Sequence, residues 1–143
     1  MTEETLAYLC EEMKKAERSL KAAKKLIEEK LTDDAISRAY YAVFHSARAV
    51  LKTKGVDTKT HQGLITQFAL HLVKPGLLET EYGDILRQGK EDRETGDYEP
   101  FVTFDLEEAE KRVKDAERFI IRVLKYLKDS GFEFAAHERG NPR

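Results

Sequence analysis

The chain of 143 residues has one cysteine, three prolines and no tryptophan. Because Cys10 is alone, an internal disulfide bond and a thiolate zinc site are both excluded, and the single thiol fits the reducing cytoplasm. No apolar run is long enough to cross a bilayer. The N-terminus contains Glu3, Glu4, Glu11 and Glu12 and has neither the basic start nor the apolar centre of a signal peptide. We therefore expect a cytoplasmic protein without a membrane anchor.

Several signatures of chemistry are also missing from the sequence. There is no Glu-x-x-His motif and no pair of histidines three to five residues apart, so a metal site is poorly supported. Glycine-rich phosphate loops are absent, and no Ser or Cys nucleophile stands beside a plausible base. We expect neither a metal ion nor a cofactor.

Charged residues make up 36% of the chain, with both signs interspersed and a formal net charge of −2. Such a composition predicts one soluble domain with a solvated surface. The general basic footprint of a nucleic-acid-binding protein is absent. Any contact with phosphate would have to come from a local cluster of cations.

Apolar residues recur at steps of three and four along three long segments, which predicts amphipathic helices. The first helix spans about residues 3–30. The second runs from Thr32, a suitable N-cap, to about Lys54, and it is apolar around most of its circumference, as expected of a central helix. Asp105 can cap the fifth helix, which ends at Gly131.

Two more helices are expected between the second and the fifth. A short third helix begins after about Thr58 and stops near Lys74; His61 falls on its apolar side, and we interpret it as a packing residue rather than a ligand. The fourth begins near Leu77. Its apolar pattern fades beyond Leu86, so we expect its polar end to be mobile or exposed.

Long helices with short connections pack as an antiparallel bundle with crossing angles near about 20°. We therefore predict an all-α protein, an antiparallel four-helix bundle with an additional short helix. Residues 1–130 would form the single domain, and residues 131–143 a C-terminal tail.

The second helix carries one polar stripe, formed by Arg38, Tyr41, His45 and Arg48. Arg38 and His45 are seven residues apart, so they project within about 20° of each other and lie about 10 Å apart along the helix. A guanidinium that loses its hydration needs a partner to offset the cost. The stripe therefore implies either a partner or a ligand.

Two interpretations of this stripe remain open. In the structural one, it is an ion-pair seam whose carboxylate comes from the fourth helix or from a second subunit. In the functional one, it lines a phosphate-binding cleft in which Arg38 grips oxygen atoms and His45 transfers a proton.

A second polar group closes the fourth helix. Arg93 and Asp97 are four residues apart and would pair if the helix continues that far, but Gly96 makes a loop equally plausible. As structural residues, Asp97 would neutralise Arg38 or cap a helix, and Tyr98 would lie in the core. As functional residues, they would line the mouth of the same cleft.

The string S-R-A-Y-Y-A-x-F-H, from Ser37 to His45, is followed by T-H-Q-G at residues 60–63 and by R-x-x-x-D-Y, from Arg93 to Tyr98. This pattern resembles the HEPN domain family, specifically its small stand-alone prokaryotic branch. The resemblance covers about residues 5–128.

The resemblance implies a bundle of four to five helices that forms a homodimer and is often encoded beside a minimal nucleotidyltransferase as a toxin-antitoxin pair. Many HEPN proteins are metal-independent ribonucleases with an Arg-x4-6-His motif, and others bind nucleotides. Arg38 and His45 have the spacing of that motif. In the nuclease members the motif lies on a later helix, and here neither Arg87 nor Arg93 is followed by a suitably spaced His.

Three hypotheses follow. The first is a nucleotide- or RNA-binding module that acts with a minimal nucleotidyltransferase. Its ligand would contact the polar side chains of both groups: Arg38, Tyr41, His45, Arg48, Arg93, Asp97 and Tyr98. The second is a metal-independent ribonuclease with His45 as acid or base and Arg38 as phosphate clamp. The third is a helical dimer that binds other proteins without catalysis.

Overall fold

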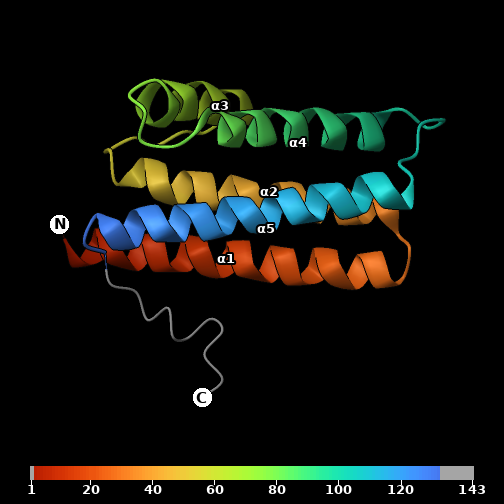
Figure 1. Ribbon diagram of the computed structural model, residues 1–143, viewed down its shortest axis with the longest axis horizontal. Helices are drawn as coiled ribbons and strands as arrows, with labels where there is room; N and C mark the ends of the chain where they lie inside the picture. Colours follow the sequence, from red (N-terminus) through yellow and green to blue (C-terminus); the bar gives the residue numbers. More distant parts are fainter. Residues whose placement is uncertain (1, 133–143) are drawn as a thin grey trace, which may run out of the picture.

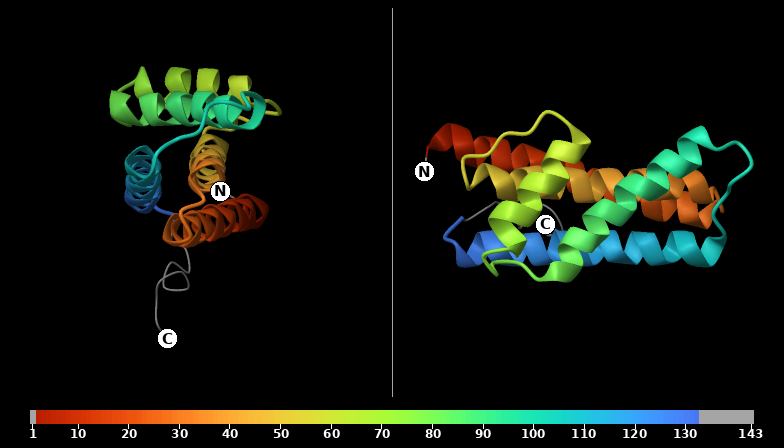
Figure 2. Two further views of the ribbon diagram at one scale, coloured as in Figure 1. Left: turned by 90° about the vertical axis from the view of Figure 1, so that its right-hand side faces the viewer. Right: turned by 90° about the horizontal axis from the view of Figure 1, so that it is seen from above.

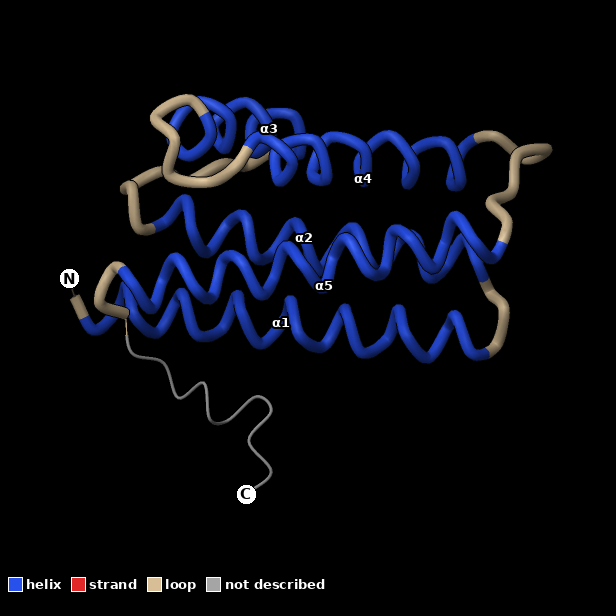
Figure 3. Tube along the Cα trace, in the orientation of Figure 1, coloured by secondary structure: helices blue, strands red, loops and turns tan. Residues whose placement is uncertain are grey.

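The computed structural model describes residues 2–132, which form helices joined by turns and short loops (Figure 3). This confirms the all-α class. The elements in chain order are α1 (Glu3–Glu28), α2 (Thr32–Lys52), α3 (His61–Phe68), a π-helical turn (Ala69–Val73), α4 (Thr80–Tyr98) and α5 (Leu106–Asp129).

Two helix starts show how side chains set the boundaries. Asp105 caps α5 as predicted, since its side chain accepts a hydrogen bond from the backbone of Glu108 while the Glu108 side chain accepts one from the Asp105 backbone. The expectation that Thr32 caps α2 is wrong by one residue. Leu31 occupies the cap position and makes no side-chain cap bond. Asp33, in the first turn of α2, accepts a hydrogen bond from the backbone N–H of Phe104.

The helices form two layers. α1, α2 and α5 run side by side along the long axis, and α3 and α4 lie on the α2 side of this group (Figure 1). Seen from above, α4 crosses α2 and α5 obliquely (Figure 2). α2 packs against α1, α3, α4 and α5, so the predicted central position of this helix is confirmed.

Small residues on α2 allow its neighbours to approach closely. Its buried alanines occupy every part of the helix: Ala35, Ala39, Ala42, Ala47 and Ala49. Large buried side chains from other elements belong to the same core, including Leu9 from α1, Phe68 from α3 and Phe119 from α5. Each such side chain contributes about 1.5–3 kcal/mol on burial, so the helices are held mainly by this shared core.

The polar end of α4, expected to be mobile or exposed, continues as helix to Tyr98 and is only partly exposed. Two features hold the second half of α4 against the bundle. Gly89 packs directly on Tyr40, where an added Cβ would lie 2.9 Å from the ring. Asp92 is buried and paired with an arginine of α5. The inward-facing groups are a glycine and a paired acid, so hydrophobicity does not reveal them.

The described chain ends at Phe132, which packs against the core after Gly131 turns the backbone with a φ of +94°. Most of the predicted tail, residues 133–143, lies outside the described residues. No helix within residues 2–132 is long and apolar enough to cross a bilayer.

Candidate nucleic-acid interface

The polar stripe of α2 divides into two clusters. The first, the Arg38 cluster, consists of Arg38, Tyr41, Arg93 and Asp97. The guanidinium carbon of Arg38 lies 5.0 Å from the centre of the Tyr41 ring, and that of Arg93 lies 5.2 Å from it. Two cations from different helices therefore share one aromatic ring, at a distance that favours cation-π attraction.

The two arginines of this cluster differ in their carboxylate partners. Arg93 faces Asp97 four residues later on α4 at 3.6 Å, so the predicted pair forms because the helix continues. Among residues 2–132, no carboxylate lies within ion-pair distance of Arg38. Asp97 does not neutralise Arg38, contrary to the structural interpretation of the sequence. Arg38 is exposed, so its guanidinium group is accessible from solution.

The second cluster, the His45 cluster, joins α2 to α1 through Tyr8, Glu12, His45 and Arg48. The His45 Nδ1 atom lies 2.7 Å from the Glu12 carboxylate, and the Arg48 Nε atom lies 3.1 Å from it. Arg48 also donates a hydrogen bond of 3.0 Å to the Tyr8 hydroxyl. The seam interpretation is thus confirmed for this half of the stripe, but the expected source of the carboxylate was wrong. It comes from the first helix.

The Glu12 carboxylate is almost fully buried, with 7% of its side chain exposed. Burial alone would raise its pKa, but the hydrogen bond from His45 and the charge of Arg48 outweigh burial and hold the pKa below its usual value. An ionised carboxylate only accepts hydrogen bonds, so the Nδ1 atom of His45 is the donor. The Nε2 atom takes no part in this hydrogen bond, and 17% of the His45 side chain is exposed.

Aromatic rings connect the two clusters. The Tyr41 and His45 rings lie 6.4 Å apart, and Phe44 packs on His61 from α3 at 4.8 Å. His61 shares a 2.6 Å hydrogen bond with the buried Tyr40 hydroxyl, which agrees with the packing role predicted for it. Burial, followed by nearby cations, lowers the pKa of His61 and favours its neutral form.

Two lysines extend the cationic surface beyond the predicted residues. The Lys52 Nζ atom lies 4.8 Å from the centre of the Tyr8 ring, at the C-terminal end of α2. Lys90 of α4 is paired with Glu94 at 2.8 Å. From Arg38 to Lys52 the surface follows α2 for about 21 Å. We call this surface the cationic aromatic face; its members are Tyr8, Arg38, Tyr41, Phe44, His45, Arg48, Lys52, Lys90 and Arg93.

Tyr98 does not belong to either cluster. The expectation that it lies in the core is wrong, because 71% of it is exposed at the end of α4. Within residues 2–132, no hydrogen bond, ion pair or ring contact joins Tyr98 to the Arg38 cluster.

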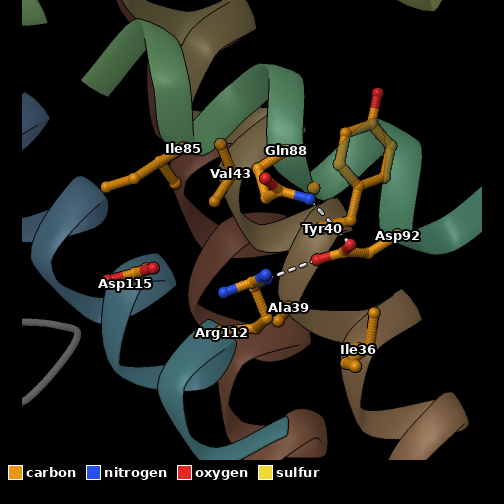
Figure 4. A pocket seen from close by; sticks show the side chains of 10 residues that line it. Ile36, Ala39, Tyr40, Val43, Ile85, Gln88, Asp92, Arg112 and Asp115 are labelled. Carbon is orange, nitrogen blue, oxygen red and sulfur yellow. Dashed lines mark hydrogen bonds and ion pairs between the residues drawn. The ribbon is translucent and has the colours of Figure 1, made fainter. Parts of the chain in front are cut away.

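A separate polar site lies inside the bundle and was not predicted. Asp92 of α4 forms an ion pair with Arg112 of α5 and accepts a 2.9 Å hydrogen bond from Gln88 (Figure 4). The cavity beside this pair measures about 20 Å³ and is lined largely by Ile36, Val43 and other core residues. That volume matches one water molecule, so the cavity is far too small for a nucleotide.

The described residues contain no group of three or more His, Cys, Asp or Glu side chains arranged to hold a metal ion. The chemistry available on the cationic aromatic face is therefore that of guanidinium, ammonium and imidazole groups beside aromatic rings. Guanidinium groups bind phosphate oxygens, and aromatic rings stack with bases.

Comparison with known proteins identifies the family. The model of the HEPN domain matches residues 11–126. A protein of Methanocaldococcus jannaschii named as a candidate toxin is 45% identical over 114 residues, which cover 80% of this chain and 84% of that protein. A second protein of the same organism with the same kind of name is 33% identical over 115 residues, or 80% and 78% of the two chains. A UPF0332 protein of Thermotoga maritima is 32% identical over 116 residues, or 81% and 88%. The chain therefore belongs to the HEPN domain family.

Proposed function

We propose that the cationic aromatic face binds the phosphate groups of a nucleotide or of RNA. The observation that carries this proposal is the Arg38 cluster, in which two guanidinium groups from α2 and α4 flank Tyr41. Arg38 has no carboxylate partner in the described chain. A phosphate between the two arginines would supply the missing negative charge, and a base would stack on a neighbouring ring.

The cationic aromatic face is better suited to bind phosphate than to bind a protein partner through exposed lysines. Its cations come from two helices and converge on rings, whereas its carboxylates, such as Glu12 and Asp97, are already engaged with His45, Arg48 and Arg93. The chain's net charge of −2 disfavours binding of polyanions elsewhere. A local cationic surface of this kind would confine binding to one site.

The test is titration of a fluorescently labelled 12-nucleotide single-stranded RNA, and separately of ATP, with wild-type protein and Arg38→Ala. We expect at least a tenfold loss of affinity, with a melting temperature within about 2 °C of wild type because Arg38 is exposed. Arg18→Ala is the matched control, since Arg18 is an exposed arginine on α1. Equal losses in both variants, or none in either, would contradict the proposal.

Salt dependence gives a second readout. If three to five cations contact phosphates, log K should fall with log[salt] with a slope of about −2 to −3.5 for single strands. Arg38→Ala should make this slope shallower by about 0.7. A slope near zero would show that phosphate contacts do not drive binding.

A second candidate function, metal-independent RNA cleavage, is favoured by the hydrogen bond between Glu12 and His45. It orients the imidazole and leaves the Nε2 atom to act as acid or base, as in other carboxylate-histidine pairs. Cleavage would proceed by attack of the RNA 2′-oxygen on the phosphorus of the adjacent phosphate, which Arg38 would hold, while the P–O5′ bond to the next nucleotide breaks. The imidazole would take the proton of the 2′-hydroxyl or give a proton to the leaving 5′-oxygen. This function predicts that RNA cut in the presence of EDTA carries cyclic-phosphate ends. His45→Gln should abolish the cutting. Intact RNA at large protein excess would argue against cleavage.

We further propose that the protein is the toxin of a cytoplasmic toxin-antitoxin pair, that it forms a homodimer, and that its partner is a minimal nucleotidyltransferase. The names of the two Methanocaldococcus jannaschii relatives support the toxin role alone. The dimer and the nucleotidyltransferase partner are proposed from what the HEPN family implies. Expression should slow growth, and co-expression of a neighbouring gene with a Gly-Ser pair and an Asp-x-Asp motif should restore it. Light scattering of the purified protein tests the dimer directly.

A further inference from the structure

One end of the bundle is strongly acidic. It is formed by the end of α1 with the start of α2, residues 28–34, and by the end of α4 with the start of α5, residues 98–110 (Figure 1). These two segments, which we call the acidic end, contain nine Asp and Glu residues and one lysine, a formal charge of −8. The Asp33 carboxylate accepts a hydrogen bond from the Phe104 backbone at 3.1 Å, so the segments are in direct contact.

The same end exposes large apolar side chains. Phe101 is 96% exposed, and Val102 on the same loop and Tyr98 at the end of α4 are exposed as well. Leu31, on the other connection, is 48% exposed. Four of the six exposed large apolar residues in the described chain therefore lie at this end, and exposed apolar surface is a common feature of interaction sites.

The loop that carries Phe101 is held in place rather than simply extended into solvent. The Val102 backbone N–H donates to the Glu99 carbonyl at 3.1 Å, and Phe104 is bound to Asp33. Asp105 and Glu108 form the capping box that follows. Helix capping accounts for Asp105 and Glu108. It does not account for the outward position of Phe101.

We propose that the acidic end docks an apolar segment flanked by lysine or arginine on another protein. Phe101 would enter a hydrophobic contact, and the surrounding carboxylates would pair with the cations. A second copy of this chain docked end to end would bring two charges of −8 together, which opposes association. The proposal uses no residue of the cationic aromatic face, so it does not depend on the proposed nucleic-acid binding.

The test uses a labelled 14-residue amphipathic peptide of leucine and lysine as the probe, and a twin in which glutamate replaces lysine. We expect the full-length protein to bind the lysine peptide and not the glutamate peptide. Phe101→Ser should weaken binding at least fivefold. The double variant that combines Phe101→Ser with Glu99→Lys should bind more weakly still. Higher salt should weaken binding of the lysine peptide.

The matched control is Ile121→Ser, since Ile121 is 61% exposed on α5, outside the acidic end. It should leave peptide binding unchanged. Equal effects of Phe101→Ser and Ile121→Ser would overturn the proposal, and so would absence of peptide binding. Concentration-dependent self-association that Phe101→Ser abolishes would also overturn it, since the occupant would then be a second copy. RNA binding should be unchanged in Phe101→Ser, which separates this test from that of the proposed function.

Discussion

Replacing Glu12 by Gln should destabilise the protein and leave the Arg38 cluster intact. Glu12 is the shared carboxylate of His45 and Arg48, at 2.7 and 3.1 Å, and it is almost fully buried. The substitution keeps the size of the side chain and one acceptor oxygen, but it removes the charge. His45 and Arg48 are then left without their counterion.

The magnitude follows from the exposure of the three groups. Breaking a buried ion pair costs about 3–5 kcal/mol, but 32% of the Arg48 side chain is exposed and keeps part of its hydration. The amide oxygen of the new residue can still accept a hydrogen bond from His45. We therefore expect a loss of about 2 kcal/mol in unfolding free energy, equivalent to roughly 6 °C in Tm for a domain of this size.

Urea and thermal unfolding measured by circular dichroism provide the assay. Glu11→Gln is the control, because Glu11 is the adjacent residue but is exposed and forms a surface ion pair with Lys14; it should change stability by less than about 0.5 kcal/mol. Because the pKa of Glu12 is lowered in the folded state, its contribution is present above pH 4.5 and is lost as pH falls through the folded value. The difference in unfolding free energy between wild type and Glu12→Gln should therefore become smaller as the pH falls below 4.5. Equal stability of the Glu11 and Glu12 variants at pH 7 would refute the reasoning.

Three further predictions concern the bundle. Gly89→Ala should cost about 1–2 kcal/mol by calorimetry, since its Cβ would lie 2.9 Å from Tyr40; in Gly83→Ala the nearest atom would be at 3.4 Å, so that variant should be unchanged or up to about 1 kcal/mol more stable. Asp92→Ala should cost about 3 kcal/mol in urea unfolding, because it leaves a half-buried arginine unpaired. His61 has a lowered pKa, so wild-type stability should fall as pH drops from 6.5 through the folded value. His61→Gln should lack this slope between pH 7.5 and 5.5, and an identical slope in both proteins would contradict it.

The architecture was predictable where hydrophobic periodicity decides the structure. The steps of three and four in the first, second and fifth segments correctly predicted α1, α2 and α5, and the apolar circumference of the second correctly predicted its central position. Helix ends were less predictable. Thr32 was predicted to be the N-cap of α2, but Leu31 occupies that position. With either residue as the cap, the acidic residues lie in the first turn.

The extent of α4 and the carboxylate of the seam were not predicted, for one shared reason. Asp92 and Glu12 are acidic residues at positions where the helix faces the core, and their charges are tolerated only because arginine or histidine from another helix meets them. A signal existed: Glu12 falls among Leu9, Met13 and Ala16 in the buried stripe of α1. Which cation meets such an acid depends on the packing of helices far apart in sequence, and the sequence pattern does not encode that directly.

The distribution of charge links the two proposed surfaces. The acidic end carries −8 while the whole chain carries −2, so the rest of the protein carries a formal charge of +6. A nucleic acid bound as proposed would be repelled by the acidic end and attracted to the remainder, where Arg38 has no carboxylate partner in the described chain. A cationic protein segment would be attracted to the acidic end and repelled by the rest of the protein. Because the two attractions favour different parts of the bundle, both ligands could bind one protomer at the same time, and binding of either should survive mutations that abolish the other.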